Sequence, residues 1–104
     1  MLSAGSVVST ADDINRWLYS FCNGKIVDSK SLDKLYKSDK KYCYGWFNNK
    51  GSFYHMGNTN SYTAIDFVVP SKKIAVTILS NIGMYSDIEK LAKELCNGVF
   101  KIKI

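Results

Sequence analysis

The sequence has little proline, little histidine and few cysteines. Its 104 residues include one proline, Pro70, one histidine, His55, and three cysteines. Cys22, Cys43 and Cys96 are odd in number, lie far apart and form no Cys-x-x-Cys pair, so neither a zinc site nor a disulfide framework is indicated. We therefore expect no metal and no cofactor.

Long apolar runs and a leader segment are also missing. No apolar stretch reaches the roughly 18 residues that suggest a membrane span, and Met1 is not followed by a basic region and a long apolar run. As written, the chain is therefore expected to be a soluble cytoplasmic product without a membrane partner. Its balance of 46% hydrophobic and 22% charged residues, with no internal repeat or linker, predicts one globular domain over residues 1–104.

The charge is positive but spread along the chain. The net charge is +5, and 13 of the 14 basic residues are lysines. Six lysines between positions 25 and 41 alternate with Asp28, Asp33 and Asp39, which favours a solvated helical face and no nucleic-acid partner. The alternative is a small basic nucleic-acid-binding domain, although no RNP-like motif is present. Its stacking platforms would be the strand aromatics Tyr42, Tyr44, Trp46, Phe53 and Tyr54.

Apolar periodicity predicts three helices. The first, at about 10–23, begins at a cap formed by Ser9 or Thr10. Its buried stripe, which places Trp17 in the core, consists of Ile14, Trp17, Leu18, Phe21 and Cys22. A weaker helix is predicted at about 29–37. The last, at about 86–97, has a capping box of Ser86 with Glu89, and Glu89 also forms an i,i+4 pair with Lys93.

The middle of the chain predicts strands at about 42–47, 52–57, 62–69 and 74–80. Turn residues at 48–51 and 70–73 separate them. The strand at 74–80, IAVTILS, is apolar on both faces apart from Thr77, so we expect both of its faces to be covered. The predicted class is α+β, with an antiparallel meander of about four strands flanked by helices.

Four stretches of the sequence resemble a known family when taken in order. They are AGSVVSTADDINRW at 4–17, YCYGW at 42–46, HMGNTNSY at 55–62 and the P-x(9)-SN of 70–81. Together they resemble the C-terminal third of the serine β-lactamase and penicillin-binding-protein superfamily, in its class C and esterase-like branch. The resemblance covers about residues 4–97 and implies a partial β-lactamase/transpeptidase-like fold.

The chemistry that the resemblance implies is acyl transfer. In this family a serine of a Ser-x-x-Lys motif attacks a β-lactam, peptide or ester carbonyl, assisted by a Tyr-x-Asn loop and by a strand bearing Lys-Thr-Gly or His-x-Gly. Only the strand element is matched here. His55 aligns with its Lys or His, Gly57 with its glycine, and the backbone N–H of Asn58 would serve the oxyanion hole. Tyr44 and Trp46 are candidate substrate-binding residues, with a core position as the alternative favoured for both.

The nucleophile is not expected in this chain. Ser31-x-x-Lys34 and Ser38-x-x-Lys41 satisfy the spacing, but both lie in a surface segment rich in lysine and aspartate, and no Tyr-x-Asn occurs. We therefore expect the chain alone to be catalytically inactive. A β-lactam, a D-amino-acid peptide or an ester would be a substrate only of the longer parent protein, which belongs to a family that also works outside the cytoplasm.

Some positions depart from the family pattern. Ser6, Cys43 and Ser61 stand where glycine is usual, so tight approaches there are in doubt. Asp66 lies inside an apolar strand and is interpreted as a salt partner or an exposed residue rather than a catalytic one. The strand at 74–80 pairs in this family with an N-terminal strand that the chain lacks, which predicts a homo-oligomer or a complementing N-terminal segment.

Overall fold

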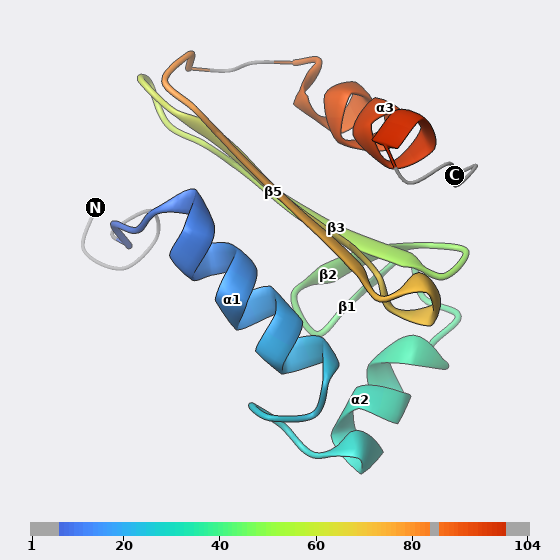
Figure 1. Ribbon diagram of the computed structural model, residues 1–104. Helices are drawn as coiled ribbons and strands as arrows, with labels where there is room; N and C mark the ends of the chain where they lie inside the picture. The colour runs from blue at the N-terminus through green and yellow to red at the C-terminus, as the bar shows by residue number, and fades with distance from the viewer. Residues whose placement is uncertain (1–6, 84–85, 100–104) are drawn as a thin grey trace.

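The structure is a computed structural model that describes residues 7–83 and 86–99. Over these residues the chain forms three α-helices and one antiparallel sheet with the strand order β1-β2-β3-β4-β5, a simple meander. Helices α1 and α2 lie on one side of the sheet and α3 on the other (Figure 1). The α+β class is therefore confirmed. The elements are α1 Ala11–Cys22, α2 Ser29–Tyr36, β1 Tyr42–Cys43, β2 Trp46–Asn49, β3 Ser52–Asn58, β4 Thr63–Val69, the 3-10 turn η1 Pro70–Lys72, β5 Ile74–Ser80 and α3 Ile88–Val99.

The sheet has five strands in the described chain where about four were expected. Tyr44 and Gly45, with φ of 52° and 85°, form a tight turn that folds the predicted strand at 42–47 back on itself. Cys43 consequently pairs with Trp46. Positive φ at both central residues is what a type I′ two-residue hairpin turn requires. This turn was not predicted from the sequence, because tyrosine is rarely found in that conformation.

The predicted N-terminal cap is present in α1 but not in α3. The Thr10 hydroxyl accepts a hydrogen bond from the Asp13 backbone N–H at 3.1 Å, so Thr10 caps α1. Helix α3 begins at Ile88, two residues later than predicted, so Ser86 does not occupy the cap position of the predicted capping box. The predicted pair of Glu89 and Lys93 is present at 3.4 Å.

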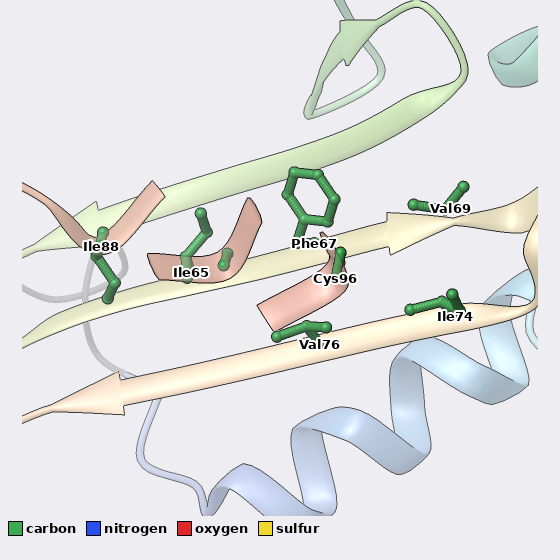
Figure 2. Close-up of a cluster of buried hydrophobic side chains, with 8 residues drawn as sticks. Ile65, Phe67, Val69, Ile74, Val76, Ile88 and Cys96 are labelled. Carbon is green, nitrogen blue, oxygen red and sulfur yellow. The ribbon is translucent and has the colours of Figure 1, made fainter. Parts of the chain in front are cut away.

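Two apolar clusters cover opposite faces of the sheet. On the α3 side, Phe67 of β4 and Val76 of β5 pack with Cys96 and their neighbours (Figure 2). On the other side, Leu18 of α1 packs with the cluster that contains Val68 and, partly buried, Ala75. Both faces of β5 are therefore covered, as its apolar sequence predicted. Burial of this apolar area is the main source of the fold's stability.

The prediction that Trp17 belongs to the core is wrong. Its side chain is 46% exposed and stacks on Phe21, with ring centroids 5.2 Å apart. Leu18 is the residue of α1 that is completely buried. The predicted apolar stripe is wide, and only its centre faces the sheet, so Trp17 lies at the margin of the interface.

Candidate functional site

His55 lies on β3 and is exposed to solvent. Its ring stacks near Phe47 with centroids 5.8 Å apart and lies 6.1 Å from the ring of Tyr42. These contacts hold one side of the imidazole against the β1–β2 hairpin. The rest of the ring is exposed to solvent, so the His55 side chain is accessible to a ligand.

Asp66 of β4 is the direct register partner of His55. The carboxyl is half-buried, and burial raises its pKa, while the nearby His55 acts in the opposite direction. Over the described residues the two side chains form no ion pair. The sequence-based interpretation of Asp66 as a salt partner or exposed residue therefore misses its main property, which is a partly desolvated carboxyl.

The backbone N–H of Asn58 points to an open edge of the sheet. Strand β2 pairs with β3 only as far as Tyr54, and no described strand continues beside residues 55–58. The Thr59 N–H donates to the Tyr62 carbonyl at 2.8 Å, on the β4 side. Successive residues of an antiparallel strand direct their N–H groups to opposite sides. The Asn58 N–H therefore faces away from β4, where it is available to an incoming acceptor.

Gly57 is not explained by packing or by backbone conformation. Its φ is outside the positive region, and a Cβ atom placed there would meet nothing within 4 Å. Any small residue would therefore fit the isolated chain. A ligand lying close to the backbone would require glycine at such a position.

Thr63 is a buried residue at this site that sequence reasoning missed. Its hydroxyl lies 3.0 Å from the Asn58 side-chain Oδ1 and 2.8 Å from the Ile82 carbonyl. It thereby connects the end of β3 to the segment after β5. No sequence signal marked Thr63, because threonine at the start of a strand is common.

The other two predicted site residues lie elsewhere. Trp46 is 7% exposed and belongs to the core cluster on the α1 side, which is the alternative that the sequence favoured. Tyr44 is 71% exposed at the tip of the β1–β2 turn, so the same alternative fails for it. The candidate site therefore consists of His55, Gly57 and Asn58 along one strand.

The two described positions that depart from the pattern of the resembled family are ordinary surface or core positions. Cys43 is half-buried and packs against the cluster containing Trp46. Ser61 is exposed, and its N–H donates to the Thr59 hydroxyl at 3.3 Å within a turn. Ser6 lies outside the described residues. Neither described position interrupts the strand that carries His55.

The two Ser-x-x-Lys matches do not form an activated serine over residues 7–83 and 86–99. Ser31 is exposed in the first turn of α2, where its N–H donates to the Asp28 carboxylate at 2.8 Å. The Ser38 hydroxyl accepts from the Lys40 backbone N–H at 3.2 Å. Neither hydroxyl contacts a lysine amine, the group that activates the serine in this type of site.

Within 7–83 and 86–99, no three His, Cys, Asp or Glu side chains gather closely enough to hold a metal ion. The helices described there are all too short or too polar to cross a bilayer. Cys22, Cys43 and Cys96 carry free thiols.

Comparison of the chain with family models, with curated proteins and with solved structures finds no match.

Proposed function

We propose that this chain is the C-terminal part of an acyl-transfer enzyme related to the serine β-lactamases and penicillin-binding proteins, and that it supplies one wall of the active site. The observation that carries the proposal is the placement of three groups on one strand. The Asn58 N–H lies at an open edge, Gly57 leaves space beside it, and the His55 ring is exposed. The resemblance in sequence assigns roles to the same three residues.

The wall acts on a carbonyl compound by binding it and polarising it. The carbonyl oxygen of a β-lactam, D-amino-acid peptide or ester at the edge of β3 would accept a hydrogen bond from the Asn58 N–H. This bond stabilises the negative charge that develops on the oxygen. Gly57 allows the substrate backbone to lie close to the strand. His55, about 7 Å from Gly57 along the strand, offers a hydrogen bond to a substrate carboxylate or to the developing charge.

The attacking group must come from another segment. The described serines with Ser-x-x-Lys spacing lack the amine contact, and the Tyr-x-Asn element is absent from the sequence. The chain alone is thus a carbonyl-binding surface without a nucleophile. A complementing N-terminal segment would add the serine, the lysine and the second oxyanion donor.

Amide NMR tests the binding step without requiring turnover. The ¹⁵N-labelled chain is titrated to millimolar concentration with a D-alanyl-D-alanine peptide, with benzylpenicillin and with a short-chain ester. At least one compound should shift the amides of residues 55–58 selectively. Gly57→Val should remove these shifts by filling the space beside the strand, whereas Gly98→Val, also at an open position but in α3, should leave them. A folded chain whose amides at 55–58 respond to none of the three compounds would refute the proposal.

A second candidate function, assembly through β5, is favoured by the edge of the sheet. In the described chain no strand pairs with the outer side of β5. Because the N–H and C=O groups of successive strand residues alternate between the two sides, those of Ala75, Thr77 and Leu79 point away from β4. The Ala75 carbonyl accepts a hydrogen bond from the Asn15 side-chain amide at 3.2 Å. The other outward backbone groups have no strand partner in the described chain, and the Leu79 side chain is 41% exposed.

The proposed partner at this edge is the β5 strand of a second copy, because an antiparallel pair of identical edges closes a two-fold dimer. Sedimentation velocity should show a concentration-dependent dimer that Leu79→Lys disrupts, since a charge on an edge strand opposes pairing. Ile82→Lys, at an exposed residue beyond the strand, serves as the control. A monomer at the highest accessible concentration would exclude this candidate.

A further inference from the structure

An open hollow lies between the end of α2 and the β1–β2 hairpin. Its volume is about 430 Å³, within the usual range for small-molecule sites. The side chains that matter for its chemistry are Lys34, Lys37, Ser38, Lys40, Tyr42 and Tyr44. The proposed acyl-transfer site does not use this lysine–tyrosine hollow.

The hollow is positively charged. Lys37 pairs with Asp33 at 3.8 Å, and both side chains are mostly exposed, so the pair leaves the lysine largely available. In the described chain, Lys34 and Lys40 form no ion pair, and no carboxylate lines the hollow. Lys34 also complements the C-terminal end of the α2 dipole. That role does not account for Lys40, which lies beyond the helix.

Two tyrosine rings lie beside these lysines. Tyr42 is 50% exposed, and its ring is held by Phe47, with centroids 4.7 Å apart in an edge-on arrangement. Tyr44 is 71% exposed and has a φ of 52° in a turn position that favours asparagine or glycine. Folding of the isolated chain gains little from Tyr44, since its ring is mostly in solvent and its backbone is strained. Strain of this kind is typical of functional positions.

We propose that the lysine–tyrosine hollow binds a nucleotide unit. The lysine ammonium groups would hold the phosphate as point charges, and the exposed tyrosine rings would stack on the base. An acidic peptide would use the lysines but not the flat ring surfaces. A duplex keeps its bases stacked on one another, so the ligand is a free nucleotide or one unit of a single strand. The proposal does not require the acyl-transfer role of His55, Gly57 and Asn58, although the two sites adjoin where the Tyr42 ring lies 6.1 Å from that of His55.

Fluorescence anisotropy with a labelled eight-nucleotide dT strand tests the proposal, and unlabelled adenosine monophosphate serves as the competitor. Binding should weaken as salt rises. Tyr44→Asn should weaken it about tenfold while leaving the fold intact, because asparagine suits the turn. Tyr62→Asn, at another exposed tyrosine, is the matched control and should not change it. Lys40→Gln should also weaken binding, and Lys72→Gln in η1 should do so far less.

The outcomes separate the two sources of the ligand. Displacement of the strand by adenosine monophosphate at micromolar concentration, with the same dependence on Tyr44, identifies a free-nucleotide site. Binding of the strand without such displacement identifies a single-strand site. No binding at low salt, or binding that Tyr44→Asn and Lys40→Gln reduce no more than their controls do, overturns the proposal, because the net charge alone would then explain any attraction.

Discussion

His55 and Asp66 stand directly opposite each other on β3 and β4, with the imidazole exposed and the carboxyl half-buried. Cross-strand partners are close enough to influence each other's charge. Burial raises the pKa of Asp66 and His55 lowers it, so the exposed ring offsets part of the cost of a charge inside the sheet. The pair therefore connects the candidate site to the stability of the sheet.

The first prediction concerns Asp66→Asn. A carboxyl whose pKa is raised by folding contributes stability below its ordinary pKa of 3.8, and this contribution is lost as pH rises through the higher folded value. The variant, which cannot ionise, should therefore be more stable than the wild type at pH 7, by on the order of 0.5 kcal/mol, and should lose this advantage near pH 3. Denaturant melts at both pH values measure the difference. An advantage that is equal at both pH values, or present only in acid, would contradict the assignment.

A second prediction concerns the Tyr36 hydroxyl. This buried hydroxyl makes no hydrogen bond of ordinary geometry in the described chain, and its polar neighbour is the Cys22 thiol; burial and this neighbour together raise the pKa of Tyr36. A thiol is a weak hydrogen-bond partner, and removing a buried polar group without a well-formed hydrogen bond is neutral or favourable, so Tyr36→Phe should raise the free energy of unfolding by between 0 and about 1 kcal/mol. Tyr36→Ala, which also removes the ring packed 5.4 Å from Phe53, should lower it by about 3 kcal/mol. A clear loss of stability in Tyr36→Phe would show that the Cys22 thiol satisfies the hydroxyl.

Gly83 provides a test of the loop next to the site. A Cβ atom at this position would overlap the backbone carbonyl of Asn60, which is not free to move as a side-chain end would be. Gly83→Ala should therefore destabilise the chain by about 1–3 kcal/mol. The matched control is Gly98→Ala in α3, where the added methyl group meets open space and the helix should gain up to about 1 kcal/mol. Equal effects of the two substitutions would show that the approach of Gly83 to Asn60 does not persist in solution.

Thr63→Val tests the positioning of Asn58. The substitution keeps the shape of the buried side chain but removes the hydroxyl near Asn58 Oδ1 and the Ile82 carbonyl. We expect the free energy of unfolding to fall by about 1–3 kcal/mol and the amide signals of Asn58 and Ile82 to shift in NMR spectra. Thr77→Val, at a threonine on β5, is the control and should leave those two amides unchanged. An unaltered Asn58 amide in Thr63→Val would mean that Thr63 does not position this residue.

Much of the fold could be predicted from residue patterns because the patterns are local. The cap at Thr10, the pair of Glu89 with Lys93, and the two covered faces of β5 each depend on residues a few positions apart. The prediction of one strand at 42–47 was wrong because Tyr44 adopts a disfavoured backbone conformation that splits it. The prediction for Trp17 was also wrong, because the width of an apolar stripe does not tell which residue faces the sheet.

The candidate site was less predictable because it depends on pairing between strands. His55 could be chosen from the sequence, but its partner Asp66 and the open edge beside Asn58 follow from the register of β2, β3 and β4. The gathering of Lys34 and Lys40 with Tyr44 likewise needs the hairpin to fold back toward α2. Spacing along the chain contains no information on such contacts.

Intact-mass spectrometry after incubation with fluorescent penicillin and with a p-nitrophenyl ester tests the central claim most directly. A chain that holds the carbonyl-binding wall but no activated serine should keep its unmodified mass and should release no p-nitrophenol above the rate in buffer. An acyl adduct on a serine of this chain, lost in Ser31→Ala or Ser38→Ala, would contradict the account.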